Sequence, residues 1–392
     1  MKYFLTLIQL WVGFLSICAS YPKANIWIIP SVESPQVYRN YAQTSKVHLE
    51  MARGEVEHIQ LVFPSKVNEE YRFTFDRYLK GIQISARELK KMNGYYDALV
   101  PFKNQLKCTD TLTAVWITVQ CPSRVPVGKY HQTIKIEGSK HFTIQLDYNV
   151  HHTTIPLKSS IPITVGVENR CMTEGLNDKE ADKERQRWVD FVLSYRMTPV
   201  FGTQITPERW QYEHSFSPWA WNDKRSIRLL NDRRYSCYML PFFTLSENEL
   251  ASLLCNIQKK GKLKESLFYI WDEPAYMEDY EQIKRKVNII RKYASDARIL
   301  TTFFCGPRNG PRKGDLYAVF DYLKHHIHVA TISLAPCKGN EEEVQHIRYK
   351  VPEGIDWWSY VCWQPGGNEP NFLLQMKGIQ QRAVMWLSLI PI

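Results

Sequence analysis

The sequence predicts a β-sandwich domain followed by an α/β domain of the (β/α)8 barrel type. Residues 24–150 contain short alternating strands separated by turns, without a long helical pattern, which is typical of a sandwich of antiparallel sheets. From residue 161 onward, apolar strands alternate with amphipathic helices, which indicates βαβ units and a parallel sheet. A chain of 392 residues also accommodates one smaller and one larger domain.

The composition is that of a globular protein with sizeable cores. Hydrophobic residues make up 44% of the chain and aromatic residues 13%, which excludes wholesale disorder. The formal net charge is +10, but the Lys and Arg residues are scattered, and the densest runs, residues 259–264 and 284–292, are interleaved with apolar positions. We therefore expect a solvated basic surface and no nucleic-acid partner.

The first 20 residues are typical of a secretory signal peptide. Lys2 supplies the positive start, residues 4–17 are largely apolar, and Ala19 and Ser20 are the small residues that precede cleavage. The apolar run is too short for a membrane span, which needs about 20 residues. Lipid attachment at Cys18 is an alternative that the bulky side chain before it disfavours. The sequence thus predicts a secreted or periplasmic protein.

The predicted sandwich domain covers residues 21–155. Its alternating segments are residues 47–51, 58–63, 114–119, 132–136 and 142–146. Gly128 and Gly138 mark turns, and no combination of residues typical of a catalytic site stands out. Cys108 and Cys121 are either buried thiols, the preferred interpretation, or a bridge between neighbouring strands.

The predicted α/β domain covers residues 156–392. We expect strands at residues 161–167, 198–202, 235–243, 267–273, 298–304, 327–334 and 356–363, and helices at residues 179–196, 245–260, 278–293, 316–324 and 372–389. Ser246 and Glu249 have the spacing of a capping box. Because a closed barrel needs an eighth strand, either residues 204–234 hide one or the barrel lacks its last strand. The second alternative is preferred, since the given sequence stops at Ile392.

Two adjacent acids follow the fourth predicted strand. The apolar and aromatic residues 267–271 stop at Asp272, Glu273 and Pro274, and a proline cannot continue the strand ladder. Both acids therefore lie at the carboxyl end of a buried strand, where the active sites of (β/α)8 barrels are found. The alternative is a solvated turn that only ends the strand.

Three motifs together resemble the catalytic region of glycoside hydrolase family 123 and related uncharacterised bacterial proteins. They are Tyr-Ile-Trp-Asp-Glu-Pro at residues 269–274, Trp-Trp-Ser-Tyr-Val-Cys-Trp-Gln-Pro at residues 357–365 with Asn371 after it, and Gln-Arg-Ala-Val-Met-Trp at residues 381–386. Arg53-Gly54-Glu55 and Gly128-Lys129-Tyr130 are similar to the N-terminal sandwich of that family. Family members continue into a further strand, which this sequence lacks after residue 389.

The resemblance implies a β-N-acetylgalactosaminidase-like enzyme that works by substrate assistance and needs no cofactor. In this mechanism the 2-acetamido group of the sugar attacks its own anomeric carbon, which replaces the protein nucleophile. Glu273 would be the general acid/base, and Asp272 would orient and stabilise the acetamido group. The chemistry requires a protonated Glu273 and an ionised Asp272 at rest.

The aromatic strand at residues 357–363 supplies most of the candidate substrate-binding residues. We expect Tyr360 to hydrogen-bond the acetamido group, and the other members of the set to contact the sugar; the set consists of Trp271, Trp358, Tyr360, Trp363 and Glu168. Core packing is the alternative for the aromatic residues and is preferred for Trp357, and a solvated loop acid is the alternative for Glu168.

Two other groups of residues have weaker functional interpretations. Trp219 and Trp221 could form a lid or a sugar platform in the long segment before the third strand. His325, His326 and His328 lie away from the carboxyl ends of the strands, and we predict no metal site. A rival hypothesis, based on the missing strand, is a non-catalytic glycan-binding protein of the same fold.

Overall fold

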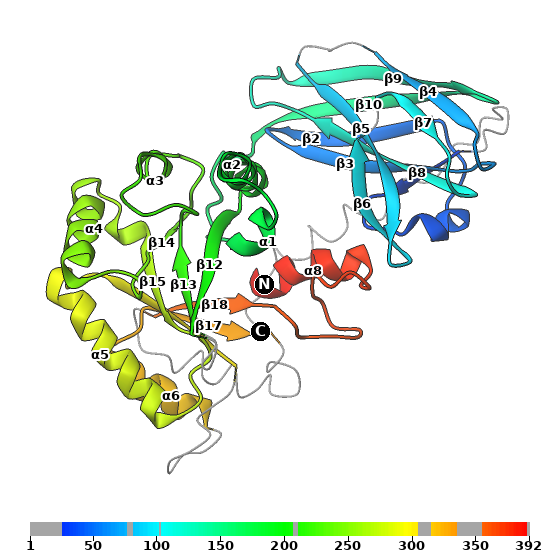
Figure 1. Cartoon of the computed structure of the whole chain (residues 1–392). Helices are drawn as coiled ribbons and strands as arrows, with labels where there is room; N and C mark the ends of the chain where they lie inside the picture. The colour runs from blue at the N-terminus through cyan, green and yellow to red at the C-terminus, as the bar shows by residue number, and fades with distance from the viewer. Residues whose placement is uncertain are drawn as a thin grey trace, which may run out of the picture. The chain divides into compact units, whose positions relative to one another are not determined.

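The computed structural model describes residues 26–76, 81–101, 103–206, 211–304, 315–334 and 355–389 (Figure 1). The predicted signal peptide, residues 1–20, lies outside the described residues. The chain divides into two compact units, of which the first ends at Thr154 and the second begins at Ile155. Within the described ranges, every helix is too short or too polar to cross a membrane.

The first unit consists of two five-stranded sheets. One sheet has the order β1-β3-β8-β5-β6, formed by Trp27–Pro30, Val56–Pro64, Leu112–Gln120, Gln83–Met92 and Tyr95–Pro101. The other has the order β2-β10-β9-β4-β7, formed by Lys46–Arg53, His141–Thr154, Gly128–Gly138, Glu70–Phe75 and Gln105–Lys107. Neighbouring strands are antiparallel, except that β2 and β10 run parallel. A short 3-10 helix, η2, spans Pro35–Asn40.

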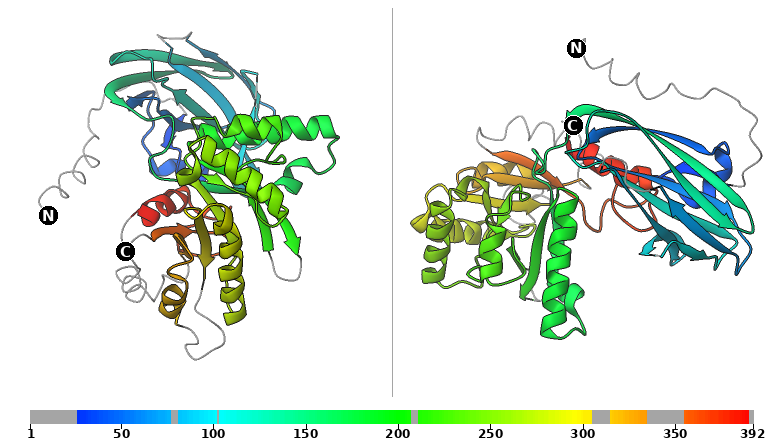
Figure 2. Two further views of the ribbon diagram at one scale, coloured as in Figure 1. Left: turned by 90° about the vertical axis from the view of Figure 1, so that its left-hand side faces the viewer. Right: turned by 90° about the horizontal axis from the view of Figure 1, so that it is seen from above.

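The two sheets lie face to face around one apolar core, as a β-sandwich (Figure 2). Leu61 and Ile117 come from the first sheet, and Phe73 and Ile144 from the second, and all are buried. Every second side chain of these strands points inward, which explains the alternation in the sequence. Cys108 and Cys121 are also buried in this core as free thiols, so the structure does not contain the alternative bridge.

Gly138 ends β9 in a place where no side chain fits. A β-carbon there would lie 2.4 Å from the backbone oxygen of Glu70 on the neighbouring strand. We expect Gly138→Ala to lower the unfolding free energy of the first unit by about 1–3 kcal/mol, because the strands must shift apart. Chemical denaturation measures the effect, and Gly166→Ala in β11, where a β-carbon has nothing within 4 Å, is the control. Equal stabilities of both variants would contradict this expectation.

The described residues of the second unit form two separate sheets. A three-stranded sheet has the order β11-β12-β13, formed by Thr164–Glu168, Thr198–Thr206 and Gln211–Ser215. A five-stranded parallel sheet has the order β14-β15-β16-β17-β18, formed by Tyr238–Met239, Ser266–Trp271, Arg298–Phe303, Val329–Ser333 and Asp356–Tyr360. β11 and β12 are parallel, whereas β13 is antiparallel to β12.

The prediction of a (β/α)8-type barrel is wrong. All seven predicted strands are present, but among the described residues they form only a parallel half-barrel sheet and the separate three-stranded sheet. The reason is β13, which lies in the poorly patterned region 204–234 and occupies the edge of β12 that would otherwise pair with β14. β14 is only two residues long, and its Met239 carbonyl accepts a hydrogen bond from the Phe216 amide that follows β13. The ladder of parallel strands is therefore interrupted between β12 and β14.

Helices cover one face of the parallel sheet (Figure 1). The helices in the described residues of this unit are α1 Asn169–Thr173, α2 Asp178–Ser194, α3 Lys224–Leu229, α4 Glu247–Lys259, α5 Met277–Tyr293, α6 Leu316–Leu323 and α8 Gly378–Leu389, with the 3-10 helix η4 at Leu263–Glu265. The predicted capping box of Ser246 and Glu249 is confirmed at the start of α4. Leu254 of α4, Val287 of α5 and Phe320 of α6 share the main core of this unit with Phe268 of β15.

The opposite face of the sheet carries a smaller apolar cluster. Its buried members are Val200, Cys237, Met239, Leu267, Leu300 and Val329, and Tyr269 and Trp358 pack against it. We call this side the inner face of the sheet. Side chains from β12, β14, β15, β16, β17 and β18 converge on the inner face, and the acid pair lies at its carboxyl edge.

Candidate active site

An irregularity in β15 places Asp272 on the inner face of the sheet. Tyr269 pairs with Leu300 of β16, but the next pair is Trp271 with Thr301, so one extra residue is inserted. Ile270 and Trp271 consequently both belong to the core beneath the helices. A β-bulge of this kind shifts the side-chain alternation by one residue. Asp272 therefore lies on the same side as Tyr269.

Two hydroxyl groups hold the Asp272 carboxylate. The Tyr269 hydroxyl donates to Oδ1 over 2.6 Å, and the Thr302 hydroxyl of β16 donates to the same oxygen over 2.9 Å. Burial, together with the charge of Asp272, raises the pKa of Tyr269 well above its usual value, so the phenol stays a donor. Among the described residues, both hydrogen bonds of this carboxylate go to Oδ1. Oδ2 is therefore the oxygen that can accept a hydrogen bond from a ligand.

Glu273 is held separately, by Tyr360 of β18. The Tyr360 hydroxyl donates a hydrogen bond to Oε1 of Glu273. Burial, the bond to Glu273 and the two negative charges raise the pKa of Tyr360 above that of a free phenol. The backbone of Glu273 is left-handed, with φ of 45°, a conformation that is uncommon for a residue with a side chain. The Glu273 amide donates to the Thr302 hydroxyl over 3.0 Å.

His214 of β13 lies beside Tyr269 and near the Asp272 carboxylate. Its ring centre lies 4.1 Å from that of Tyr269, and its Nδ1 contacts the backbone oxygen of Tyr212 over 3.2 Å. Burial lowers the pKa of His214 to about 4, although the nearby Asp272 carboxylate acts in the opposite direction. The ring is therefore neutral at pH 7 and packs as a flat, uncharged support for Tyr269.

The lowered pKa of His214 makes stability depend on pH. The unfolded chain protonates this ring near pH 6.5, whereas the folded protein protonates it only near pH 4, so the unfolded state binds more protons between these values. The unfolding free energy should fall by about 3 kcal/mol as the pH drops from 6.5 to 4. Denaturation at several pH values measures this slope. His214→Gln should reduce the slope by this amount, while His58, His326 and His328, whose pKa values are also lowered by burial, keep their own contributions. An identical slope in that variant would contradict the assignment.

The structure brings only some of the predicted substrate-binding residues to the acid pair. Tyr360 contacts Glu273, and Trp358 packs against the inner face with Tyr269. Trp271 is 6% exposed in the helix-covered core, because of the bulge. Trp357 also packs there, with its ring centre 5.8 Å from that of Phe320.

Two other candidates have no described contact with the acid pair. Trp363 lies beyond the end of β18 and is 89% exposed. Glu168 ends β11, is exposed, and accepts a hydrogen bond from the Cys171 thiol.

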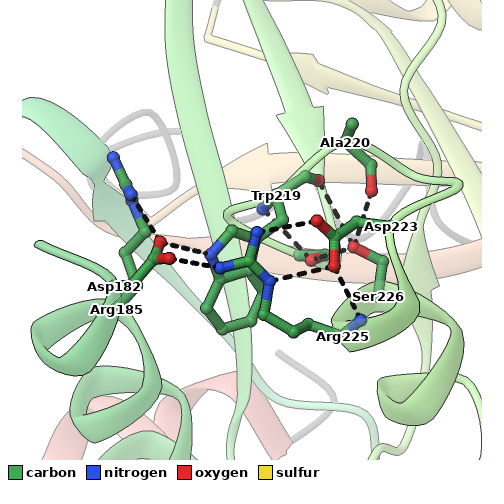
Figure 3. Close-up of polar contacts among 8 residues, drawn as sticks. Asp182, Arg185, Trp219, Ala220, Asp223, Arg225 and Ser226 are labelled. Atoms are coloured by element: carbon green, nitrogen blue, oxygen red, sulfur yellow. Dashed lines mark hydrogen bonds and ion pairs between the residues drawn. The ribbon is translucent and has the colours of Figure 1, made fainter. Parts of the chain in front are cut away.

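Trp219 is buried, and charged side chains contact its indole ring (Figure 3). Its indole nitrogen donates to Asp182 of α2 over 3.0 Å, and the Arg225 guanidinium stacks 4.6 Å from its ring centre. Arg225 in turn forms ion pairs with Asp182 and Asp223. Trp221 packs against the same core. These contacts give both tryptophans a structural role, and neither has the exposure of a lid.

Two cavities in the described residues are lined by side chains other than the acid pair. One, of about 160 Å³, is lined by β5, β6 and the start of β8 in the first unit. The other, of about 510 Å³, lies between the N-terminal half of α2 and the Trp219–Arg225 stack. Segments 305–314 and 335–354, which follow β16 and β17 in the sequence, lie outside the described residues. In the described ranges no group of three or more His, Cys, Asp or Glu side chains could hold a metal ion.

Comparison with solved structures shows a similar fold in a glycoside hydrolase. A family 123 glycoside hydrolase from Clostridium perfringens, studied for glycolipid glycan hydrolysis, matches with a TM-score of 0.57 and 13% identity over 93% of this chain and 76% of that chain. The chain therefore has a glycoside hydrolase-like fold. Scans of family models and of curated proteins found no match.

Two other solved structures share less of the fold. An FMN-binding β-glucuronidase from Facaelibacterium prausnitzii has a TM-score of 0.28 and 11% identity, over 88% of this chain and 50% of that chain. A GH5 xyloglucanase from Bacteroides ovatus has a TM-score of 0.18 and 9% identity, over 74% of this chain and 69% of that chain. TM-scores this low do not support an inference about this protein.

Sequence reasoning did not assign a role to three residues around the pair. Tyr269 was read only as part of an apolar strand, although a tyrosine three residues before an acid could have signalled a hydrogen bond. Thr302 belongs to a different strand, and only the register of β15 with β16 brings it to Asp272. His214 lies on β13, within residues 204–234, where a hidden strand was the alternative not preferred from the sequence.

Proposed function

We propose that this protein is an exported glycoside hydrolase that removes terminal β-linked N-acetylhexosamine, with N-acetylgalactosamine as the first candidate, from a glycan or glycoconjugate. The observation that carries the proposal is the pair of adjacent acids held in two different ways. Asp272 accepts two hydroxyl donors on one oxygen, and Glu273 accepts a hydrogen bond from the Tyr360 phenol. The glycoside hydrolase-like fold supports the same reaction class.

Asp272 is suited to the acetamido group of the substrate. With Oδ1 occupied by Tyr269 and Thr302, Oδ2 accepts the acetamido N–H and aligns the acetamido oxygen with the anomeric carbon. As that oxygen attacks, positive charge develops on the acetamido group and is stabilised by the adjacent carboxylate. The bond from the anomeric carbon to the leaving oxygen breaks in the same step.

Glu273 is suited to move the proton. Because Tyr360 donates to Oε1, the proton of the acid form resides on Oε2, from which it passes to the leaving oxygen. The resulting Glu273 carboxylate then takes a proton from water, whose oxygen attacks the anomeric carbon and opens the cyclic oxazolinium intermediate. Two displacements at the same carbon give net retention of configuration.

Hydrolysis of 4-nitrophenyl N-acetyl-β-D-galactosaminide tests the proposal. We expect release of 4-nitrophenol by the full chain, with the β-anomer of the free sugar appearing first in a time-resolved NMR spectrum. No release from the N-acetylgalactosaminide or the matching N-acetylglucosaminide, or first appearance of the α-anomer, would contradict it.

A second candidate function is glycan binding without turnover. The observation that favours it is the half-barrel, in which β18 pairs only with β17 among the described residues. This candidate predicts that N-acetylhexosamines bind, as measured by calorimetry, while no 4-nitrophenol is released. Detectable turnover that depends on Glu273 would exclude it.

Export is part of the proposal and is supported by the charge and apolar run of residues 1–20. Expression of the full chain in a bacterial host, followed by fractionation and N-terminal sequencing, tests it. We expect a processed chain outside the cytoplasm, beginning near residue 21. An unprocessed chain confined to the cytoplasm would contradict it.

A further inference from the structure

Thr302 forms hydrogen bonds with both acids of the pair. Its side chain is 7% exposed, on the inner face of β16. The hydroxyl oxygen lies 2.9 Å from Oδ1 of Asp272, 2.9 Å from the Tyr269 hydroxyl and 3.0 Å from the Glu273 amide nitrogen. Three polar groups thus meet at a single hydroxyl.

The available protons fix the direction of these hydrogen bonds. The Glu273 amide can only donate, so Thr302 is its acceptor. An ionised Asp272 can only accept, so Thr302 and Tyr269 each direct their single proton to it. The result is a chain of hydrogen bonds in which the Glu273 amide donates to Thr302 and Thr302 donates to the Asp272 carboxylate. In such a chain each hydrogen bond polarises and strengthens the next.

We propose that Thr302 is a positioning residue that fixes both acids of the candidate active site at once. This inference rests on the proposed function for its catalytic consequence. Thr302 orients the Asp272 carboxylate toward the acetamido group, and it holds the Glu273 amide while that residue adopts a left-handed backbone with φ of 45°. The backbone conformation in turn determines where the Glu273 carboxyl meets Tyr360.

The neighbouring Thr301 provides a matched control. It lies one residue earlier on β16, is fully buried, and faces away from the acid pair. Within the described part of the chain its hydroxyl has no hydrogen-bond partner. Replacing either threonine by valine keeps the shape of the side chain and removes only a hydroxyl. A general effect of this substitution on β16 would therefore appear in both variants.

Kinetics of three variants test the inference. We expect Thr302→Val to lower kcat on the N-acetylhexosaminide by about 10- to 100-fold with KM changed less than about 3-fold, since the acids are displaced and not removed. Thr302→Ser, which restores the hydroxyl, should keep at least about a third of the wild-type kcat, and Thr301→Val should match the wild type. Equal losses in Thr302→Val and Thr301→Val, or no loss in Thr302→Val, would overturn the inference.

A second substrate distinguishes the positioning of the two acids by Thr302 from a general loss of rigidity in the protein. An N-trifluoroacetyl sugar has a poorer acyl nucleophile, so its hydrolysis depends more on the stabilisation that Asp272 supplies. We expect Thr302→Val to lower the rate on this substrate several-fold more than on the N-acetyl substrate. A structural role alone would lower both rates by the same factor.

Amide hydrogen exchange tests the positioning without any reaction. In Thr302→Val the Glu273 amide loses this acceptor and should exchange about 5-fold faster or more, with no such change in Thr301→Val or Thr302→Ser. If the wild type hydrolyses no N-acetylhexosaminide but the exchange result holds, the proposed function fails and the positioning stands. Unchanged exchange in Thr302→Val would overturn the positioning itself.

Discussion

Glu273→Gln should reduce kcat/KM on an alkyl N-acetyl-β-hexosaminide by about 1,000- to 10,000-fold. An alkoxide is a poor leaving group, so the bond to it breaks only if a proton arrives in the same step. Glutamine keeps the size of the side chain and its contact with Tyr360, but it has no acidic proton to donate. Rates of sugar release from the wild type and the variant, at equal protein concentration, measure the effect.

Comparing two substrates with different leaving groups provides a further test of this prediction. 4-Nitrophenolate leaves readily without a proton, so Glu273→Gln should lose much less activity on the 4-nitrophenyl substrate than on the alkyl substrate. Glu174→Gln, at an exposed glutamate with a side chain 73% exposed, is the control and should match the wild type. Equal losses on both substrates would argue that Glu273 does not act as the general acid.

Asp272→Asn should lower kcat on N-acetylhexosaminides by about 100- to 1,000-fold. Asparagine can still accept the bonds of Tyr269 and Thr302 through its amide oxygen. It carries no negative charge, however, and its NH2 group can take the place of Oδ2 opposite the acetamido N–H. Both effects act on the transition state, in which the acetamido group becomes positive. The measurement is kcat and KM for the 4-nitrophenyl substrate.

Asp296→Asn is the matched control for this substitution. Asp296 is exposed and precedes β16 at the amino end of the strand, away from the acid pair. We expect its kcat to equal that of the wild type. If Asp272→Asn retained full activity as well, Asp272 would have no role in stabilising the acetamido group.

The hydrophobic periodicity of the sequence was enough to locate the strands of the second unit. It did not show which strands pair with one another in sheets. The seven predicted strands and the start of α4 follow from local apolar patterns and from the Ser246–Glu249 capping box. Closure of a barrel depends on which edges pair, and this was decided by β13, a short strand of mostly polar residues, Gln-Tyr-Glu-His-Ser. Such a strand has no apolar alternation to reveal it.

The sequence was enough to predict the two acids of the candidate site, but not the residues that contact them. Asp272 and Glu273 could be placed at a strand end because Pro274 terminates the strand. Regular alternation would place Trp271 on the same face as Tyr269, but the bulge at residue 270 turns its side chain toward the helix-covered core. Thr302 meets the pair through strand register, which no local pattern encodes.

Trp219 illustrates a different gap between sequence and structure. In the sequence it is a tryptophan in a polar loop, which is compatible with a sugar platform. In the structure its indole is buried, and its nitrogen donates a hydrogen bond to Asp182, which lies 37 positions away in the sequence (Figure 3). Long-range polar contacts of this kind are not visible in composition or spacing.

The central claim is that the substrate's own acetamido group is the nucleophile, aligned by Asp272. The most direct measurement compares the wild-type rates on 4-nitrophenyl N-acetyl-β-D-galactosaminide and on 4-nitrophenyl β-D-galactoside, which carries a hydroxyl in place of the acetamido group. The account predicts release from the first and a rate at least about 1,000-fold lower from the second. Comparable rates on the two substrates would contradict it.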